Sequence, residues 1–276
     1  RDEGQSTELQ NVSSSILKDS AKLKECVRKY LTYPDHPLSV EEPLIPYLNA
    51  ISHGKPGVFV ELGAVDGVDG SSTMALEKCF GWRGLLIEGS PDLCKAWHKN
   101  MKMRPRSSFE CGAVCDMENG TLPMFKNSLG WVTMPDMFHN KRAKRSSQQA
   151  SASVPCTRMA NIMNKHDISQ ADFLVLDVEG AEQLVLNATD LKRFKLLVIE
   201  VETKSPSREA IRQIVNSSGF GFLDVYFPSW HSPNSKWDNY KRRGIGNDVY
   251  VHQDILASEW FQRVHKSERH KHVMKY

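Results

Sequence analysis

Residues 58–70, Val-Phe-Val-Glu-Leu-Gly-Ala-Val-Asp-Gly-Val-Asp-Gly, leave this chain few possible folds. Val58–Val60 predicts a short buried strand, the three glycines after it predict a tight loop, and helix-forming residues follow over 71–80. A buried strand, a glycine-rich turn and a helix N-terminus form the first unit of an open α/β sheet. Ligands of such sheets bind at the carboxyl ends of the strands, so the loop predicts a ligand site.

Strands and helices alternate along the rest of the chain. The expected strands are 58–60, 84–88, 109–114, 173–177, 196–200, 220–227 and 248–252, with a short extra strand at 121–125. The expected helices are 16–31, 71–80, 92–101, 157–166, one that opens at 181–186, and 207–218. This alternation predicts an α/β fold: a mostly parallel, seven-stranded sheet with helices on both faces.

The ends of the chain are expected to lie outside this sheet. Residues 1–50 are assigned to a polar stem and an amphipathic helix, with four prolines between 34 and 46 that predict turns. Residues 51–254 form the main domain, and 255–276 form a C-terminal helix and a basic tail. The basic, Ser/Gln-rich segment 141–153 is expected to be a surface loop.

The glycine-rich loop carries three carboxylates, Glu61, Asp66 and Asp69. Negative charge argues against a bound pyrophosphate, and the spacing fits neither a dinucleotide fingerprint nor a P-loop. An acidic loop suits a ligand with cationic groups, and S-adenosylmethionine has a sulfonium and an ammonium. The alternative interpretation is a structural turn with solvated acids.

Two further strand ends carry candidate donor-binding residues. Glu88 ends the second strand about 20 residues beyond the loop, where a carboxylate can accept hydrogen bonds from both hydroxyls of a ribose. Gly112 and Ala113 end the third strand with small side chains beside which a flat adenine can lie. Asp116 is a candidate for the adenine amino group, although acids are also common in turns.

Asp177-Val-Glu-Gly180 ends the fourth strand with two carboxylates. The fourth strand is expected beside the first, so Asp177 and Glu179 face the crevice that Glu61 and Asp66 also face. Crowded like charges are unfavourable unless a cation binds nearby. A helix N-cap is the alternative, and it accounts for Glu179 better than for Asp177.

Three runs of sequence, together with 246–251, resemble the FkbM-type methyltransferase family. The runs are Val-Phe-Val-Glu-Leu-Gly-Ala-Val-Asp-Gly, Leu-Glu-Lys-Cys-Phe-Gly-Trp-Arg-Gly-Leu-Leu-Ile-Glu and Asp-Phe-Leu-Val-Leu-Asp-Val-Glu-Gly-Ala-Glu, and the resemblance covers roughly 57–251. It implies a Rossmann-like methyltransferase fold with S-adenosylmethionine as cofactor. The expected cofactor-binding residues are Glu61, Gly63, Ala64, Asp66, Gly67, Ser72, Glu88, Gly112, Ala113, Asp116 and Asp177.

Members of this family are mostly O-methyltransferases, and sugars are among their acceptors. Asp177 and Glu179 are the expected catalytic residues. His139, His166 and His231 are alternative bases, although a surface histidine is the simpler explanation for each. No third ligand accompanies Asp177 and Glu202, so no metal is expected. The expected acceptor-binding residues are Trp230, His231, Trp237 and Tyr240, because aromatic and polar side chains together suit a sugar ring; a loop that packs onto the sheet is the equal alternative.

Composition bears on the compartment and on partners. The net charge of +3 does not suggest a nucleic-acid partner, and no apolar run is long enough to span a membrane, although an anchor outside this chain is possible. Six cysteines permit disulfides, and there are four glycosylation sequons, at Asn11, Asn119, Asn187 and Asn216. These features favour the secretory-pathway lumen, with the Golgi as the expected compartment and the cytoplasm as the alternative.

The function expected from sequence is an S-adenosylmethionine-dependent O-methyltransferase acting on a hydroxyl, with a glycan sugar as the expected acceptor and a small metabolite or a peptide as the alternatives. The alternative is a non-catalytic interaction protein of the secretory pathway on a methyltransferase scaffold.

Overall fold

The computed structural model describes residues 20–31, 41–127, 130–132, 152–202, 206–224 and 245–273. Within them, the large sheet has seven strands in the order β10-β11-β9-β8-β1-β2-β3. β11 pairs antiparallel with both neighbours, and the other pairs are parallel. The order confirms the predicted Rossmann-like fold and the position of the fourth strand beside the first. The strands are β1 Val58–Leu62, β2 Arg83–Glu88, β3 Ser107–Cys111, β8 Ala171–Leu176, β9 Phe194–Glu202, β10 Phe220–Phe222 and β11 Ile245–His252.

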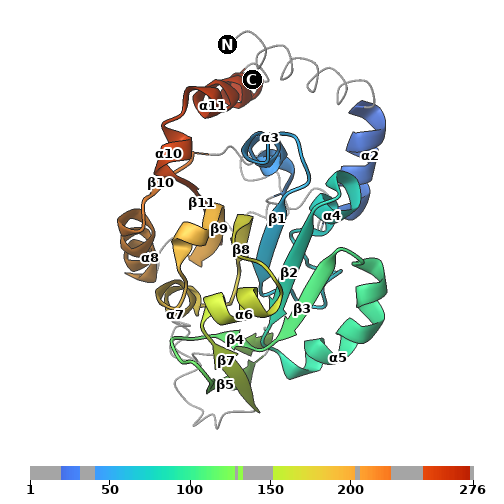
Figure 1. Cartoon of the computed structure of the whole chain (residues 1–276), viewed down its shortest axis with the longest axis vertical. Helices are drawn as coiled ribbons and strands as arrows, with labels where there is room; N and C mark the ends of the chain where they lie inside the picture. Colours follow the sequence, from blue (N-terminus) through green and yellow to red (C-terminus); the bar gives the residue numbers. More distant parts are fainter. Residues whose placement is uncertain are drawn as a thin grey trace.

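Helices cover both faces of this sheet (Figure 1). One face packs against α3, α4, α5 and α11, and the other against α6, α7 and α8. Five of the strands, β1, β2, β8, β9 and β11, place alternate residues in the two apolar clusters, as a sheet buried on both faces requires. The helices are α2 Ser20–Tyr30, α3 Glu41–Ile51, α4 Met74–Phe80, α5 Pro91–Asn100, α6 Met159–Lys165, α7 Glu182–Asn187, α8 Pro206–Ser217, α10 Gln253–Leu256 and α11 Glu259–Val273, with 3-10 turns η1 Met101–Met103 and η4 Leu191–Arg193.

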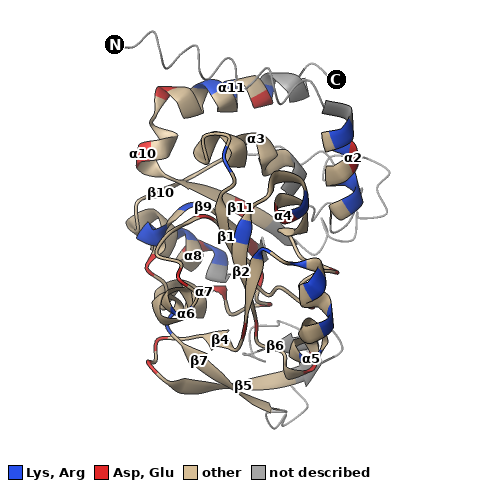
Figure 2. Ribbon diagram, turned by 45° about the vertical axis from the view of Figure 1, so that its right-hand side comes forward, with Lys and Arg blue, Asp and Glu red and all other residues tan. Residues whose placement is uncertain are grey.

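A second, smaller sheet lies at one end of the molecule, and α3, α10 and α11 lie at the opposite end (Figures 1 and 2). The strand order of the smaller sheet is β4-β7-β5-β6. The prediction of one continuous strand over 109–114 is wrong, because the chain leaves the large sheet at Gly112. A Cβ at Gly112 would lie 2.9 Å from the Pro155 carbonyl oxygen, so glycine permits the two segments of the backbone to pass this closely. The strands are β4 Ala113–Val114, β5 Gly120–Asn127, β6 Gly130–Val132 and β7 Ala152–Thr157.

The prediction that prolines keep 34–46 in turns is wrong for its last part, because α3 begins at Glu41. Pro43 lies in the first turn, where backbone N–H groups have no intrahelical acceptor. Pro46 lies inside the helix and removes one hydrogen bond. Burial of Leu44 and Leu48 against the large sheet offsets that loss.

The C-terminal helix α11 packs against α3 and is not a free tail. Phe261 is fully buried, and its ring lies 5.7 Å from that of Tyr47. The Tyr47 hydroxyl also lies 3.0 Å from Nδ1 of His265. Among the described helices, none combines the length and the apolar character that a bilayer crossing demands.

Three disulfides pair all six cysteines. Cys26–Cys79 joins α2 to α4, and Cys94–Cys111 joins α5 to the end of β3. Cys115–Cys156 joins the segment after β4 to β7. Two of the three bridges therefore hold chain segments next to the carboxyl end of the large sheet.

Candidate active site

A cavity of about 240 Å³ opens at the carboxyl ends of β1, β2 and β8. Residues from both sheets line it, including Leu62, Gly63, Val65, Ile87, Glu88, Ser90, Leu93, Gly112, Ala113, Leu122, Met124, Asp177, Glu179 and Leu184. Six of the residues expected from the sequence thus come together, namely Gly63, Glu88, Gly112, Ala113, Asp177 and Glu179. The cavity lies where open α/β sheets bind their ligands.

Gly63 lets the ends of β1 and β8 approach each other. Its φ is +76°, and a Cβ at this position would lie 1.7 Å from the Asp177 carbonyl oxygen. The Gly63 N–H donates to the Ile87 carbonyl at 3.1 Å, and the Asp177 N–H donates to the Leu62 carbonyl at 3.2 Å. The backbone of three strand ends is therefore held together at the floor of the cavity, and no other residue type fits at position 63 without strain.

The Glu88 carboxylate is oriented by two backbone donors. The Val65 N–H donates to one of its oxygens at 3.0 Å, and the Ser90 N–H donates to the other at 2.7 Å. Burial raises the pKa of Glu88, and these hydrogen bonds oppose that rise. A carboxylate offers about four acceptor positions, so Glu88 can accept from a further donor, such as a ribose hydroxyl.

Glu61 does not line the cavity but lies beneath the loop. One oxygen accepts from the Ser72 N–H at 2.6 Å, and the other accepts from the hydroxyls of Ser71 at 2.8 Å and Thr73 at 2.5 Å. Burial is the main cause that raises its pKa. The Glu61 side chain therefore shapes the loop from below through the Ser72 N–H and the two hydroxyls, and direct contact of Glu61 or Ser72 with a ligand stays a prediction.

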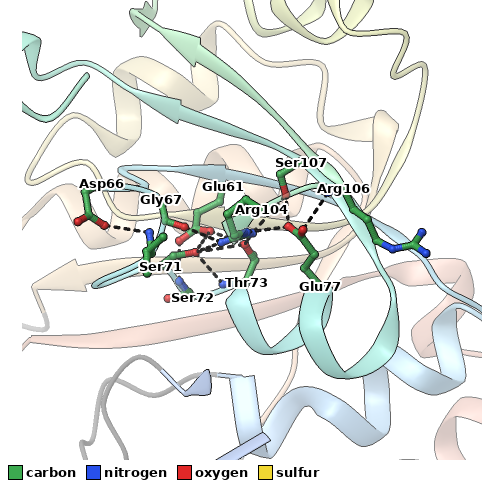
Figure 3. A network of polar contacts seen from close by, with 11 residues as sticks. Glu61, Asp66, Gly67, Ser71, Ser72, Thr73, Glu77, Arg104, Arg106 and Ser107 are labelled. Atoms are coloured by element: carbon green, nitrogen blue, oxygen red, sulfur yellow. Dashed lines mark hydrogen bonds and ion pairs between the residues drawn. The ribbon is translucent and has the colours of Figure 1, made fainter. Parts of the chain in front are cut away.

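The centre of the same network is Arg104, which the sequence analysis did not single out (Figure 3). Its side chain is completely buried and pairs with Glu77 at 2.7 Å. It also donates to the Gly67 carbonyl and to the Ser71 hydroxyl, both at 2.8 Å, and to the Thr73 hydroxyl at 2.9 Å. One guanidinium thus ties the glycine-rich loop to α4 through fixed donor directions.

The remaining expected loop residues also lie outside the cavity lining. Asp66 accepts from the Val68 and Asp69 N–H groups at 2.9 and 2.7 Å, which closes a turn within the loop. Gly67 packs beneath Trp97, and Ala64 is fully buried. Ligand contacts for Ala64, Asp66 and Gly67 stay predictions.

The small sheet closes the side of the cavity nearest β4. Leu122 and Met124 of β5 line it, and a Cβ on Gly89 would lie 3.3 Å from the Met124 methyl group. Gly112 and Ala113 are shared with a neighbouring open groove. Asp116 lies beyond both strand ends, is exposed, and pairs with Arg158 at 3.1 Å. The apolar side chains and the small residues leave a surface suited to a flat ring.

Carboxyl groups gather at the end of β8. Burial raises the pKa of Asp177 well above its ordinary value, and nearby Glu200, Glu179 and Glu182 raise it further. Glu182 accepts from the N–H groups of Val178 at 3.3 Å and Gly180 at 3.0 Å, and thereby stabilises the turn into α7. Glu179 itself is exposed, with φ of +53°. Of these acids, Asp177 and Glu179 line the cavity, and Glu88 is the one other charged residue in its lining among the described residues, which suits a cationic ligand.

The expected acceptor residues lie outside the described residues: Trp230, His231, Trp237 and Tyr240. His139 also lies outside them. His166 binds Glu110 at 2.9 Å and does not line the cavity. Among the residues that the structure describes, no group of three or more His, Cys, Asp or Glu side chains has a geometry that could hold a metal ion.

Comparisons with known proteins relate the chain to methyltransferases. The model of the family described as "Methyltransferase FkbM domain" matches residues 61–229. Solved structures similar to this chain include fibrillarin of Aeropyrum pernix with bound S-adenosyl-L-methionine, at 12% identity, a TM-score of 0.42 and coverage of 71% of this chain and 67% of that one. Methyltransferase FkbM of Methylobacillus flagellatus is also 12% identical, with a TM-score of 0.40, and the match covers 71% of this chain but only 44% of that protein.

A third similar structure is TrmK of M. capricolum with S-adenosyl-homocysteine, at 8% identity, a TM-score of 0.38 and coverage of 75% and 67% of the two chains. A comparison with curated protein sequences returned no significant match. The family match spans well over half of the chain and includes the loop, Glu88 and the end of β8. The chain belongs to the FkbM family of methyltransferases, whose methyl donor is S-adenosylmethionine.

Proposed function

We propose that this chain is an O-methyltransferase whose acceptor is a sugar hydroxyl of a glycan in the secretory pathway. The observation that carries the proposal is the presence of Asp177, Glu179 and Glu88 in one cavity. Glu88 can accept a hydrogen bond from the ribose of the donor. The two other acids lie about the floor of the same cavity, where an acceptor hydroxyl has to lose its proton.

When bound, the donor supplies a methyl group on a positively charged sulfur that is already activated for transfer. The chain contributes position, charge and a proton acceptor. Glu88 and the backbone at Gly63 would hold the donor, and the apolar side chains of Leu122 and Met124 in the cavity lining would help to exclude water. Asp177 accepts the hydroxyl proton, and burial together with the neighbouring acids raises the pKa of its carboxyl group, which makes the carboxylate a stronger base.

The choice of a sugar rests on the sequence of 228–240. Trp230, Trp237 and Tyr240 offer flat apolar faces for the C–H side of a sugar ring, and the Asn, Asp, Ser and His residues between them offer hydrogen bonds for its hydroxyls. A lipid or flat aromatic acceptor would favour a more uniformly apolar segment.

The secretory lumen, with the Golgi as the expected compartment, is supported by covalent features. All six cysteines are paired, and unpaired thiols are the rule in the cytosol. The three described sequon asparagines, Asn119, Asn187 and Asn216, are all exposed, as glycan attachment requires. Intact mass before and after N-glycosidase, from a secreting host, tests the compartment. Six free thiols and no glycan would instead favour the cytoplasm.

The function itself is tested by incubating the protein with labelled donor and a panel of glycans, peptides and phenols. We expect label on a glycan hydroxyl, a fall in kcat for Asp177→Asn, and a rise in the acceptor KM for Trp237→Ala. Label on a phenol or peptide alone would contradict the acceptor. Donor binding without transfer to any acceptor would support a non-catalytic interaction protein on the same scaffold.

A further inference from the structure

Glu200 lies beside Asp177 in the large sheet. β8 and β9 are parallel, with Leu176 paired to Ile199 and Val175 paired to Val198. The next pair in this register is Asp177 and Glu200, and paired residues of neighbouring strands point to the same face of a sheet. On the other side of Glu200, the antiparallel register pairs it with Asn247 of β11. A row of polar residues therefore runs from the cavity across three adjacent strands.

The carboxyl groups of Asp177 and Glu200 are hydrogen-bonded to each other. Two ionised carboxylates offer only acceptors, so such a bond requires a proton on one of them. Burial, the charge of Glu200 and the neighbouring Glu179 and Glu182 all favour a proton on Asp177. The pair thus carries one proton and one negative charge, as in other buried carboxyl dyads.

A protonated Asp177 cannot act as a simple base, and only Asp177 of the two lines the cavity. The geometry points to a relay, which rests on the O-methyl transfer proposed above. As one Asp177 oxygen accepts the acceptor hydroxyl proton, the proton on its other oxygen passes to Glu200. Glu200 is a positioning residue that acts through Asp177 and does not touch the acceptor.

The relay balances in protons and charge. The acceptor O–H bond breaks as its oxygen forms the bond to the methyl carbon, and the electrons of the carbon–sulfur bond stay on sulfur. The carboxyl pair changes from one proton and a charge of −1 to two protons and no charge. That change matches the loss of the positive charge on sulfur, so the dry cavity keeps the same net charge.

Glu200→Gln tests this role, because an amide can donate to Asp177 but cannot take up its proton. We expect kcat to fall by about 10²-fold, within the usual range for proton-transfer groups. We also expect the acidic limb of the pH–rate profile to move to lower pH, since Asp177 then ionises more easily. The affinity for S-adenosylhomocysteine should stay within about twofold. Glu200→Asp, which keeps a carboxyl group, should restore part of kcat, and the exposed Glu209→Gln on α8 should behave like the wild type.

A second readout does not depend on turnover. Carboxyl carbon NMR should show one resonance of the wild type that titrates well above the ordinary range, and Glu200→Gln should lower that value. An ordinary Asp177 titration in the wild type, or an unchanged pH–rate profile in Glu200→Gln, would overturn the relay alone. A shared proton together with no transfer to any hydroxyl would overturn both the relay and the proposed function.

Discussion

Replacement of the buried Arg104 should destabilise the fold more than replacement of any other single residue near the donor loop. The guanidinium and the Glu77 carboxylate are almost fully buried, so removal of one leaves the other charged and unpaired. Breaking a buried ion pair in this way costs about 3–5 kcal/mol. Arg104→Ala also leaves the Gly67 carbonyl and the hydroxyls of Ser71 and Thr73 without their donor. We therefore expect Arg104→Ala to lie at the upper end of that range.

Arg104→Lys keeps the charge but not the fork of donors. A lysine ammonium cannot reach Glu77 and the loop in the same directions, so at least one hydrogen bond to a charged group is lost, at about 2 kcal/mol. Urea unfolding measures both losses. Arg106→Ala is the matched control, because only the backbone N–H of Arg106 donates to Glu77 and its side chain is exposed. It should change the free energy of unfolding by less than about 0.5 kcal/mol.

The same variants also test whether the shape of the loop affects donor binding. Arg104 does not line the cavity, yet Arg104→Lys should weaken the binding of S-adenosylhomocysteine because the loop loses its fixed shape. A loss of stability below about 1 kcal/mol in Arg104→Ala would refute the account of this network. So would full donor affinity in an Arg104→Lys protein that is clearly destabilised.

Three further perturbations have defined outcomes. Asp177→Asn should raise the free energy of unfolding near neutral pH. The pKa of Asp177 is higher in the folded than in the unfolded protein, so the stability of the wild type falls as the pH rises from about 4 through the folded pKa. An amide does not ionise, so the difference between variant and wild type should vanish in acid. Cys94→Ser with Cys111→Ser should cost about 3 kcal/mol in urea unfolding, since the bridge closes a loop with a sequence separation of 17. Gly63→Ala should abolish donor binding and lower the melting temperature sharply. Gly81→Ala should cost only about 1 kcal/mol, because φ at Gly81 is +69° but a Cβ there would make only an ordinary contact, 3.7 Å from Cγ of Pro56.

Local sequence patterns were sufficient for the large sheet. Strands such as 58–62 and 171–176 are buried on both faces of the sheet, and burial on both faces requires nearly continuous apolar sequence, which is easy to recognise. The role of Gly63 was also predictable, because a strand that ends in glycine indicates a tight turn. The break at Gly112 was not, since it depends on β7, which is distant in sequence and approaches the backbone there.

The site was predictable where a residue meets the ligand from a strand end, and less so where it supports the loop. Glu61 and Glu88 both lie near the carboxyl ends of neighbouring strands, yet one anchors the loop and the other lines the cavity. Nothing in the local sequence distinguishes the buried Arg104 from the exposed Arg106. Their difference comes from tertiary packing of α4 against the loop, which no short pattern encodes.

Calorimetry with S-adenosylhomocysteine tests the central claim, that the cavity at the ends of β1, β2 and β8 holds the methyl donor. The account predicts one site per chain. Glu88→Gln should weaken it by about 10- to 100-fold, the value of one or two hydrogen bonds to a charged group, while the exposed Asp116→Asn should leave it unchanged. Folded protein that releases no heat in the high micromolar range, or a Glu88→Gln variant with wild-type affinity, would contradict it.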